Sequence, residues 1–352
     1  MEYNRRKFIG TAGTAGLVTA LSPTIWTKAS PSKNDTILGH NSHQYKVVEG
    51  WGILDAGKNP VNDCHEMVAD AQGRLIMITN ETRNNIIIYD KSGKLLETWG
   101  NSYPGGHGLT LTNEGGEQFL FITDTKRNQV LKTDLKGREI LKLDYPKETG
   151  MYAYPGQFLP TETAINPANG DIYVTDGYGL NYIIQYNHKG HYIRHFGGKG
   201  NDRDDQFKCC HGIVVDTRNK KNPTLIITDR SHTSLKRFTL DGKYLATIAV
   251  PGSFICRPVI KGENMYAAVY TSTAESIPNS GYMTIFDKND RVISTPGGTA
   301  PVYSDGKLNA QAKDFSFTGF MHPHDVCVDS DENLYIPQWA SKKTYPIKLE
   351  RI

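Results

Sequence analysis

A unit of alternating hydrophobic and polar positions recurs along this chain at intervals of roughly 40 to 70 residues. Each unit opens with one residue ahead of an apolar strand, turns near a glycine into a second strand, and continues with a third and a fourth. Alternation with a period of two predicts β-strands, and the glycine-containing turns mark their ends. The clearest copies cover residues 65–100, 161–197 and 211–248.

Four short strands in a unit of this length are typical of one blade of a β-propeller. Six units therefore predict an all-β, six-bladed propeller that forms a single domain over residues 44–352. The last unit has only three strands before the chain ends, and residues 45–54 are expected to supply its missing outer strand. This pairing would close the ring without a long exposed edge. Residues 31–43 are expected to form a short linker before the domain.

Residues 1–30 have the pattern of a bacterial export signal. Arg5 and Arg6 precede a short, weakly apolar run that ends in small residues. The adjacent arginines resemble a twin-arginine signal, which would engage the twin-arginine export machinery and carry the chain out already folded. An ordinary secretory signal with a chance Arg-Arg pair is the alternative. We expect a periplasmic or secreted protein with no stable membrane span after the signal is removed.

The composition agrees with a β-rich protein that has many turns, since 34 Gly, 17 Pro and 19 Tyr accompany a hydrophobic fraction of only 38%. The formal net charge is +3 and the basic residues are scattered, so we expect no nucleic-acid partner. The five cysteines are an odd number, which leaves at least one unpaired in an exported protein. We expect small buried residues; a disulfide and a thiolate metal ligand remain open alternatives.

The residue that opens each unit is the feature that suggests chemistry. In a propeller the first strand of every blade lines the central channel, so the six opening residues should form a ring at one end of the axis. Thr161 and approximately Arg257 open two of the units. Four histidines open the others, and we expect them to converge although they are far apart in sequence: His65, His107, His211 and His324.

Neutral imidazole is the commonest protein ligand for zinc and similar divalent metals. Three such ligands with one open position form a catalytic zinc site, which polarises a substrate oxygen and lowers the pKa of bound water. We therefore predict zinc, or another divalent transition metal, at the ring of histidines. The alternative is that each histidine only forms hydrogen bonds in a polar channel. His322, two residues from its opening position, is expected just behind the ligands.

Further polar residues stand where the second strand of a unit ends, at the same end of the channel. Thr-Asp recurs there, and its aspartates Asp176 and Asp229 are expected to cap the following turns behind the site. Tyr178 and Arg230 occupy the same blade position in successive units. A phenol and a guanidinium that face a metal suggest a proton-transfer group and an anchor for an anion.

Five segments carry a resemblance to a known family: HGL at 107, PTETAINPANGDIYVTDGYGLNYIIQY at 160, QFKCCHG at 206, TDRSHTSLKRF at 228 and HPHDVCVDSDENLYI at 322. They resemble the NHL-type six-bladed propellers and, among these, the peptidyl-α-hydroxyglycine α-amidating lyase domain of peptide-amidating enzymes. The resemblance extends over about residues 60–350.

The resemblance implies a zinc ion and two catalytic side chains. Its three zinc ligands match His107, His211 and His324. Its catalytic tyrosine matches Tyr178, and one of its two active-site arginines matches Arg230. The implied reaction cleaves the C–N bond of a carbinolamide, in a small-molecule or peptide-like substrate, and releases an amide and glyoxylate. Zinc would polarise the hydroxyl group, the tyrosine would act as the general base, and arginine would hold the carboxylate.

The same resemblance implies a structural calcium ion, and the sequence departs from the family at two positions. Asn80 stands where the second active-site arginine is expected, so Arg83 is the remaining candidate for that role. His65 stands where no histidine is expected, and it could add a fourth ligand or a second base. Calcium would be held by one aspartate and two backbone carbonyls: Asp325, Leu109 and, approximately, Met67.

Two other functions remain open at the level of the sequence. Many NHL propellers are not catalytic and bind protein or glycan partners, and a fold does not by itself imply a function. A propeller hydrolase of the lactonase type is the other alternative. Those enzymes line the channel mainly with carboxylate and Asn ligands for calcium, whereas this chain offers histidines.

Overall fold

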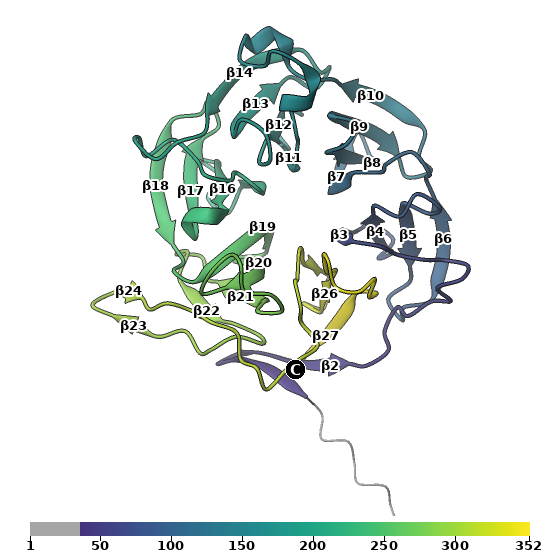
Figure 1. Cartoon of the computed structure of the whole chain (residues 1–352), viewed down its shortest axis with the longest axis vertical. Helices are drawn as coiled ribbons and strands as arrows, with labels where there is room; N and C mark the ends of the chain where they lie inside the picture. The colour runs from purple at the N-terminus through teal and green to yellow at the C-terminus, as the bar shows by residue number, and fades with distance from the viewer. Residues whose placement is uncertain (1–35) are drawn as a thin grey trace, which may run out of the picture. The chain divides into compact units, whose positions relative to one another are not determined.

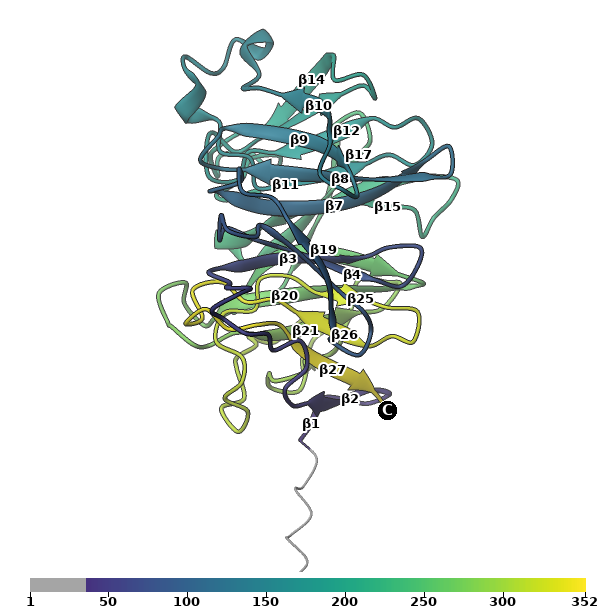
Figure 2. The same ribbon diagram turned by 90° about the vertical axis from the view of Figure 1, so that its right-hand side faces the viewer.

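The computed structural model describes residues 36–352, in which six antiparallel sheets stand around one central axis (Figure 1). Seen from the side, the inner strands run along that axis (Figure 2). The prediction of an all-β, six-bladed propeller is confirmed. The predicted export signal, residues 1–30, lies outside the described residues. Within residues 36–352 no helix has the length and apolar content that crossing a membrane would need.

Blades 1 to 5 each contain four consecutive strands, and the first strand is innermost. Their bounds are β3 (Cys64–Ala69), β4 (Leu75–Thr79), β5 (Ile86–Tyr89), β6 (Leu95–Trp99); β7 (Gly106–Glu114), β8 (Glu117–Asp124), β9 (Gln129–Asp134), β10 (Glu139–Leu143); β11 (Glu162–Ile165), β12 (Ile172–Thr175), β13 (Tyr182–Tyr186), β14 (Tyr192–Gly197); β15 (Ile213–Asp216), β16 (Thr224–Asp229), β17 (Ser234–Thr239), β18 (Tyr244–Ala249); and β19 (Ser253–Lys261), β20 (Asn264–Ser272), β21 (Tyr282–Phe286), β22 (Val292–Ser294).

The sixth blade combines strands from both ends of the described chain. It contains β25 (Cys327–Val328), β26 (Leu334–Ile336), β27 (Ile347–Arg351), β2 (His43–Val48) and β1 (Ile37–His40). The connections between strands contain a short hairpin and three 3-10 turns: β23 (Tyr303–Ser304), β24 (Lys307–Leu308), η1 (Lys147–Thr149), η2 (Pro155–Gln157) and η3 (Arg230–His232).

The ring closes through an N-terminal strand, as the sequence predicts. β2 pairs antiparallel with β27, and Val47 lies opposite Leu349 in this pairing. β1 then pairs with the free edge of β2, so the closing blade has five strands and not the expected four. Both backbone edges of β26, β27 and β2 are thereby paired within one continuous sheet.

The bounds of the closing segment differ from the prediction in two respects. β1 lies within residues 31–43, so the second half of the expected linker belongs to the sheet. β2 ends at Val48 and does not continue to residue 54. Gly50 and Gly52 have φ angles of 75° and 68°, which turn the chain out of the extended conformation.

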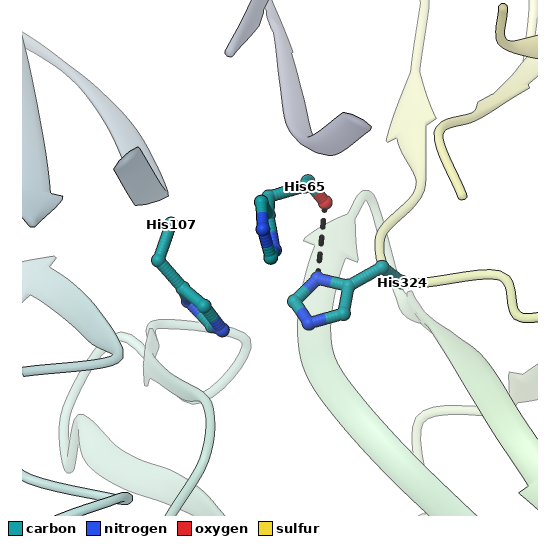
Figure 3. Close-up of side chains that lie close together, drawn as sticks. All are labelled: His65, His107 and His324. Carbon is teal, nitrogen blue, oxygen red and sulfur yellow. Dashed lines mark hydrogen bonds between the residues drawn. The ribbon is translucent and has the colours of Figure 1, made fainter. Parts of the chain in front are cut away.

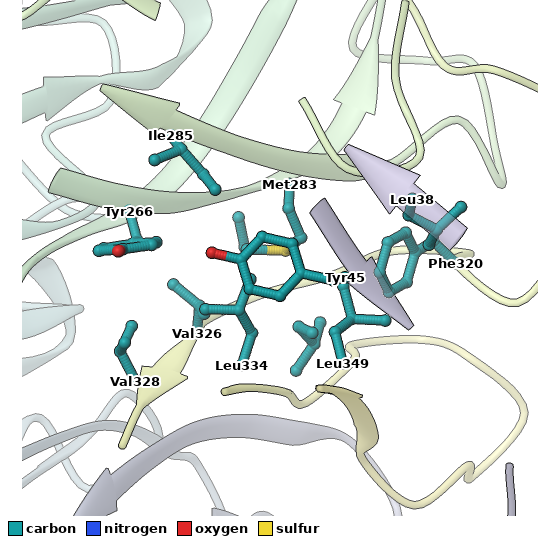
Figure 4. Packing of buried hydrophobic residues seen from close by; sticks show 12 residues of the cluster. Leu38, Tyr45, Tyr266, Met283, Ile285, Phe320, Val326, Val328, Leu334 and Leu349 are labelled. Atoms are coloured by element: carbon teal, nitrogen blue, oxygen red, sulfur yellow. The ribbon is translucent and has the colours of Figure 1, made fainter. Parts of the chain in front are cut away.

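Hydrophobic side chains fill the spaces between neighbouring blades. The middle strands β4 and β5 are buried along their whole length, because each sheet packs against another sheet on both faces. Between blades 5 and 6, Tyr45 from β2 packs with Tyr266 from β20 and Leu334 from β26 (Figure 4). The strand that closes the ring therefore also joins the core of the two blades that it seals.

Four charged side chains form a closed ring that ties blade 4 to blade 5. Arg218 Nη2 lies 2.8 Å from an oxygen of Asp216 and 2.7 Å from one of Asp290. Arg237 approaches the same two carboxylates at 2.8 and 2.7 Å. Burial alone would raise the pKa of Asp216, but the hydrogen bonds from Arg218 and Arg237 hold it at about 2.

We expect replacement of Tyr45 by Ala to lower the free energy of unfolding by about 3 to 5 kcal/mol, because the phenol side chain of Tyr45 is fully buried between two blades. Thermal or urea denaturation followed by circular dichroism measures the loss. Ile37→Ala in β1 is the control, since Ile37 is 54% exposed and its truncation should cost less than about 0.5 kcal/mol. Equal losses in the two variants would contradict the role of β2 in closure.

We expect the ion pairs of Asp216 with Arg218 and Arg237 to stabilise the fold above about pH 4. This stabilisation should be lost as the pH falls toward 2. The reason is that the pKa of Asp216 is lower in the folded chain than in the unfolded chain. Asp216→Asn should therefore be less stable than the parent by about 1 to 2 kcal/mol at pH 7, and the gap should narrow at low pH. A gap in melting temperature that stays constant from pH 6 to pH 2 would show that Asp216 is not linked to protons in this way.

Candidate functional site

The four predicted histidines converge at one end of the central channel. Figure 3 shows His65, His107 and His324 arriving from three different blades. Neighbouring imidazole rings of the four lie 4.6 to 4.9 Å apart, measured between centroids. His107 and His324 each contact all three other members, and none of the four exposes more than 6% of its surface. We call this set, which His211 completes, the histidine cluster.

Irregular strand pairing helps to direct these residues to the axis. The register of β3 against β4 shifts at His65, and the register of β7 against β8 shifts at His107. Such bulges bend a strand locally and re-aim a side chain. His211 and His324 lie just before β15 and β25 begin, so they also lie outside regular pairing.

A shared type of hydrogen bond fixes the orientation of three histidines. The Nδ1 atoms of His107, His211 and His324 lie 2.8, 3.0 and 3.1 Å from backbone carbonyl oxygens. In each case the carbonyl comes from the next blade, at or near the start of its innermost strand: Thr161, Cys256 and His65. A carbonyl only accepts, so each Nδ1 donates its proton and each Nε2 is left unprotonated, with a lone pair that can accept. This is the tautomer that a metal ligand needs.

Glycines beside two of the histidines permit this close approach of neighbouring blades. A Cβ atom at Gly108 would lie 2.7 Å from the Thr161 carbonyl oxygen, and one at Gly212 would lie 2.3 Å from the Cys256 carbonyl oxygen. Any larger residue would push away the carbonyls that orient His107 and His211. The His-Gly pairs in the sequence therefore serve the geometry of the cluster.

His65 differs from the other three histidines. Its Nδ1 atom has no hydrogen-bond partner within residues 36–352, although the side chain is buried. Burial lowers the pKa of His65 to about 3. Burial is also the largest cause that lowers the pKa of His107, His211 and His324 well below the usual range. All four rings are therefore neutral at pH 7 and able to bind a cation.

Two groups of donor atoms are compact enough to hold a metal ion. Within each group the donor atoms lie within 4.8 Å of one another. The groups are His65, His107 and His324, and His211, Cys256 and His324. Imidazole nitrogen and cysteine sulfur suit zinc and other divalent transition metals. The donor types therefore fit the kind of metal that the sequence predicts, but neither group is the predicted set His107, His211 and His324, whose members are divided between the two groups.

Tyr178 reaches into the histidine cluster from the loop between β12 and β13 of blade 3. Its hydroxyl lies 2.9 Å from His211 Nε2 and 3.2 Å from His107 Nε2. Burial of the hydroxyl raises the pKa of Tyr178 to about 12, although the nearby Arg230 opposes this shift. The residue as a whole is 40% exposed. One edge of the ring therefore faces solvent while the hydroxyl lies among the expected ligand atoms.

Arg230 lies beside Tyr178 and has no acidic partner within residues 36–352. Its Nη1 donates a hydrogen bond of 3.3 Å to the Tyr178 hydroxyl, and its Nε has no partner. The guanidinium lies 4.7 Å from the ring centroid of Tyr270 and 5.3 Å from that of Tyr178. It is only 9% exposed. A buried cation held by two aromatic rings is thus available to an anion.

Arg83 does not join the site. Its guanidinium pairs with Glu81 at 2.9 Å, and 64% of its side chain is exposed. Glu81 and Arg83 are two residues apart in the loop after β4, so their side chains pair directly. Arg83 is therefore withdrawn as a candidate for holding the substrate carboxylate.

The three residues expected behind the ligands have structural partners. Asp176 accepts hydrogen bonds from the backbone of Leu180 at 2.6 Å and from Tyr152 at 2.8 Å, and so caps its turn. Asp229 does not cap the η3 turn that follows it, contrary to expectation; its carboxylate accepts a hydrogen bond from the Lys208 N–H at 2.9 Å and pairs with Lys236 at 3.0 Å. His322 packs against Trp339, with ring centroids 6.1 Å apart, and accepts a backbone hydrogen bond from residue 279. None of the three has a described contact with the histidine cluster.

The residues expected to hold calcium do not fit that ion. The Asp325 carboxylate accepts a hydrogen bond from the Met67 N–H and lies 3.2 Å from the guanidinium of Arg257. Leu109 likewise presents its N–H, 2.6 Å from an oxygen of Glu66. Calcium requires oxygen ligands that are open to it, whereas the carboxylates here already surround the guanidinium of Arg257 and accept from backbone N–H groups. The prediction of a structural calcium ion at Asp325, Leu109 and Met67 is corrected accordingly.

The opening position of blade 5 also needs correction. Cys256, and not Arg257, supplies the carbonyl that corresponds to those of Thr161 and His65. Arg257 is the residue after it and belongs to a second layer with Glu66, Glu162 and Asp325. Sequence analysis missed this layer, although a charged residue after the opening position in four units was a visible signal. All five cysteines are free and buried, as expected.

Comparison with curated proteins confirms the suspected resemblance. No family model matches the chain. The chain is 26% identical over 328 residues, 88% of its length, to peptidylglycine alpha-amidating monooxygenase of Rattus norvegicus. It is 25% identical over 264 residues, 71% of its length, to peptidyl-glycine alpha-amidating monooxygenase of Mus musculus. The chain spans about a quarter of the length of these relatives, 28% and 24%. The distant relatives are enzymes, and this chain is a six-bladed propeller that resembles their lyase domain.

Solved structures with the same fold include two proteins that are named as lyases. A streptogramin B lyase superposes with a TM-score of 0.55 at 14% identity, over 83% of this chain and 94% of that one. The virginiamycin B lyase from Staphylococcus aureus superposes with a TM-score of 0.51 at 12% identity, over 88% of each chain. At such low identity the likeness establishes the fold alone.

We expect the purified protein to bind about one equivalent of a divalent transition metal, measured by plasma mass spectrometry. His107→Ala and His211→Ala should each lower the bound metal to less than about a tenth, because each removes an oriented Nε2 lone pair. His65→Asn should retain the metal, because no carbonyl orients that ring. His188→Ala, at an exposed position, is the control. Full retention of metal in His107→Ala and His211→Ala, with the fold intact, would contradict the assignment.

Proposed function

We propose that this propeller is a metal-dependent lyase that cleaves a carbinolamide C–N bond and releases an amide and glyoxylate. The observation that carries the proposal is the common orientation of His107, His211 and His324 by carbonyls of the next blade. A channel that needed only polar lining would not require three buried rings in one tautomer. The distant similarity to peptide-amidating enzymes supports the same reading of the site.

The three oriented histidines would hold the metal through their Nε2 atoms, and zinc is the ion that we favour. A zinc ion, when bound, supplies a Lewis acid that polarises an oxygen of the substrate. His65 lacks an orienting carbonyl, so the proposal gives it no bond to the metal. Its neutral, buried ring would instead close the side of the cluster that faces blade 1 and exclude water from it.

Tyr178 would handle the proton that the reaction transfers. In the cleavage, the substrate hydroxyl loses its proton as a C=O bond forms, and the amide nitrogen gains one as the C–N bond breaks. The hydroxyl of Tyr178 contacts both His107 and His211, so it would lie beside any group bound at the cluster. Because its pKa is raised to about 12, the phenol carries its proton at pH 7. It would accept the substrate proton as it gives up its own.

Arg230 would bind the carboxylate of the substrate. Its guanidinium is buried without a described acidic partner, and leaving a charge unpaired in that way is unfavourable. An incoming carboxylate would supply the missing charge and could accept two hydrogen bonds from the planar guanidinium. Since Arg83 points away to Glu81, the described residues offer Arg230 alone for this role.

The site would work outside the cytoplasm if residues 1–30 act as the predicted twin-arginine signal. The evidence for export is the Arg5-Arg6 pair ahead of a short apolar run. Fusion of residues 1–35 to a reporter that is active only after export tests this part of the proposal. Replacement of both arginines by lysine should abolish export through the twin-arginine machinery.

We expect the zinc-loaded protein to release glyoxylate from an N-acyl-α-hydroxyglycine, in an assay that quantifies glyoxylate directly. Tyr178→Phe should lower kcat by about 10² to 10⁴-fold, because it removes the group that moves the proton. Its metal content should stay unchanged, since no metal bond is assigned to the phenol. Tyr154→Phe is the matched control, because Tyr154 is 57% exposed and lies outside the site.

Failure of the metal-loaded protein to release glyoxylate would overturn the lyase proposal. The same preparation would then be tested with lactone substrates and on glycan and protein arrays, which report the hydrolase and the non-catalytic alternatives. A metal site that is present without lyase activity would still support the geometry of the histidine cluster but would contradict the reaction.

A further inference from the structure

A second layer of charged side chains lies directly behind the histidine cluster. Each of its members follows, in the sequence, a residue whose side chain or carbonyl belongs to the first layer. The layer comprises Glu66 after His65, Glu162 after Thr161, Arg257 after Cys256 and Asp325 after His324. The carboxylates are at most 1% exposed and the Arg257 side chain is 11% exposed. Blades 1, 3, 5 and 6 each contribute one residue.

The Arg257 guanidinium is the centre of this layer. Its Nη1 lies 3.1 Å from Glu66 Oε2 and 3.2 Å from Asp325 Oδ2. Its Nε lies 3.1 Å from Glu162 Oε2. One cation therefore joins three carboxylates from three other blades across the axis of the ring. Three negative charges that converged without it would repel one another strongly in a buried space.

These carboxylates also accept hydrogen bonds from neighbouring blades, whereas Glu66 Oε1 and Asp325 Oδ1 have no hydrogen-bond partner among the described residues. The backbone N–H groups of Leu109 and Met67 donate to Glu66 and Asp325 at 2.6 and 3.0 Å. The Thr110 hydroxyl donates to Glu162 at 2.9 Å. Through Leu109 and Thr110 the layer also contacts blade 2. It holds the inner strands at positions that directly follow the carbonyl groups orienting the imidazoles.

We propose that Arg257 is the resident cation of the propeller axis, in the role that a bound calcium ion would otherwise fill, and that it positions the histidine cluster. The guanidinium supplies a positive charge, directional donors and bulk at the point where three carboxylates meet. Cys256, whose carbonyl orients His211, is bonded directly to it in the chain. The protein therefore needs no calcium, and shortening Arg257 leaves a pocket of carboxylate oxygens that suits calcium.

The other end of the channel provides access to this layer. A cavity of about 850 Å³ is lined by residues from the later halves of all six inner strands, and Arg257 is among them. Met67 and Val326, which flank the charged layer in the chain, line it too. A small hydrated ion can therefore reach the position of Arg257 without passing the histidine cluster.

The test compares the parent protein with Arg257→Ala and Arg257→Lys in calcium-depleted buffer, with added CaCl2 and with MgCl2 as the control. The parent should contain no calcium by plasma mass spectrometry, and its melting temperature should not respond to calcium. Arg257→Ala should melt lower and should recover by about 5 °C or more in calcium but not in magnesium. Arg257→Lys, which retains the charge, should not respond.

Zinc affinity tests whether Arg257 positions the histidine cluster, independently of its effect on the stability of the fold. Arg257→Ala without calcium should bind zinc about 10- to 100-fold more weakly than the parent, and calcium should restore the affinity. One equivalent of calcium in the parent protein would overturn the proposal, and this measurement decides even if Arg257→Ala does not fold. A folded Arg257→Ala variant that is indifferent to calcium would overturn it as well. These readouts do not require lyase activity, so they stand apart from the proposed reaction.

Discussion

The antiparallel pairing of β2 with β27 is the contact on which the rest of the structure depends, because it closes the ring. Inner strands of a propeller converge only while the ring is closed, and an open end would allow the first and last blades to separate. The histidine cluster spans that seam, because His324 from blade 6 donates its Nδ1 proton to the His65 carbonyl of blade 1. Closure and the geometry of the metal ligands are therefore one property of the fold.

Two layers around the axis show how a propeller converts sequence neighbours into separate functions. Successive residues of an extended chain point to different sides, so His324, just before β25, enters the histidine cluster while Asp325 enters the charged layer. The first layer offers neutral imidazoles with unprotonated Nε2 atoms, and the second gathers three buried carboxylates around the one cation Arg257. A neutral layer of imidazoles and a layer of charged side chains are thus built from residues that are adjacent in the sequence.

The sequence predicted the repeating parts of this molecule more successfully than the single contacts. Periodicity gave the six blades and the convergence of four histidines, because both follow from symmetry that each unit repeats. It missed the five-stranded closing blade, since β1 belongs to no repeat. It also placed Arg83 near the substrate, although a local pairing with Glu81 directs that side chain elsewhere. Calcium was expected because a resemblance does not reveal that Arg257 reaches the carboxylate of Asp325.

The sequence by itself determined the strand alternation, the number of blades and which residue types open them, because these depend on periods of two residues and of one blade. Only the tertiary structure decided which atoms meet. The tautomers of His107 and His211 depend on carbonyls from other blades, and the partners of Arg257 come from three separate strands. Such contacts join residues dozens to hundreds of positions apart, so no local pattern encodes them, and they exist only once the ring is closed.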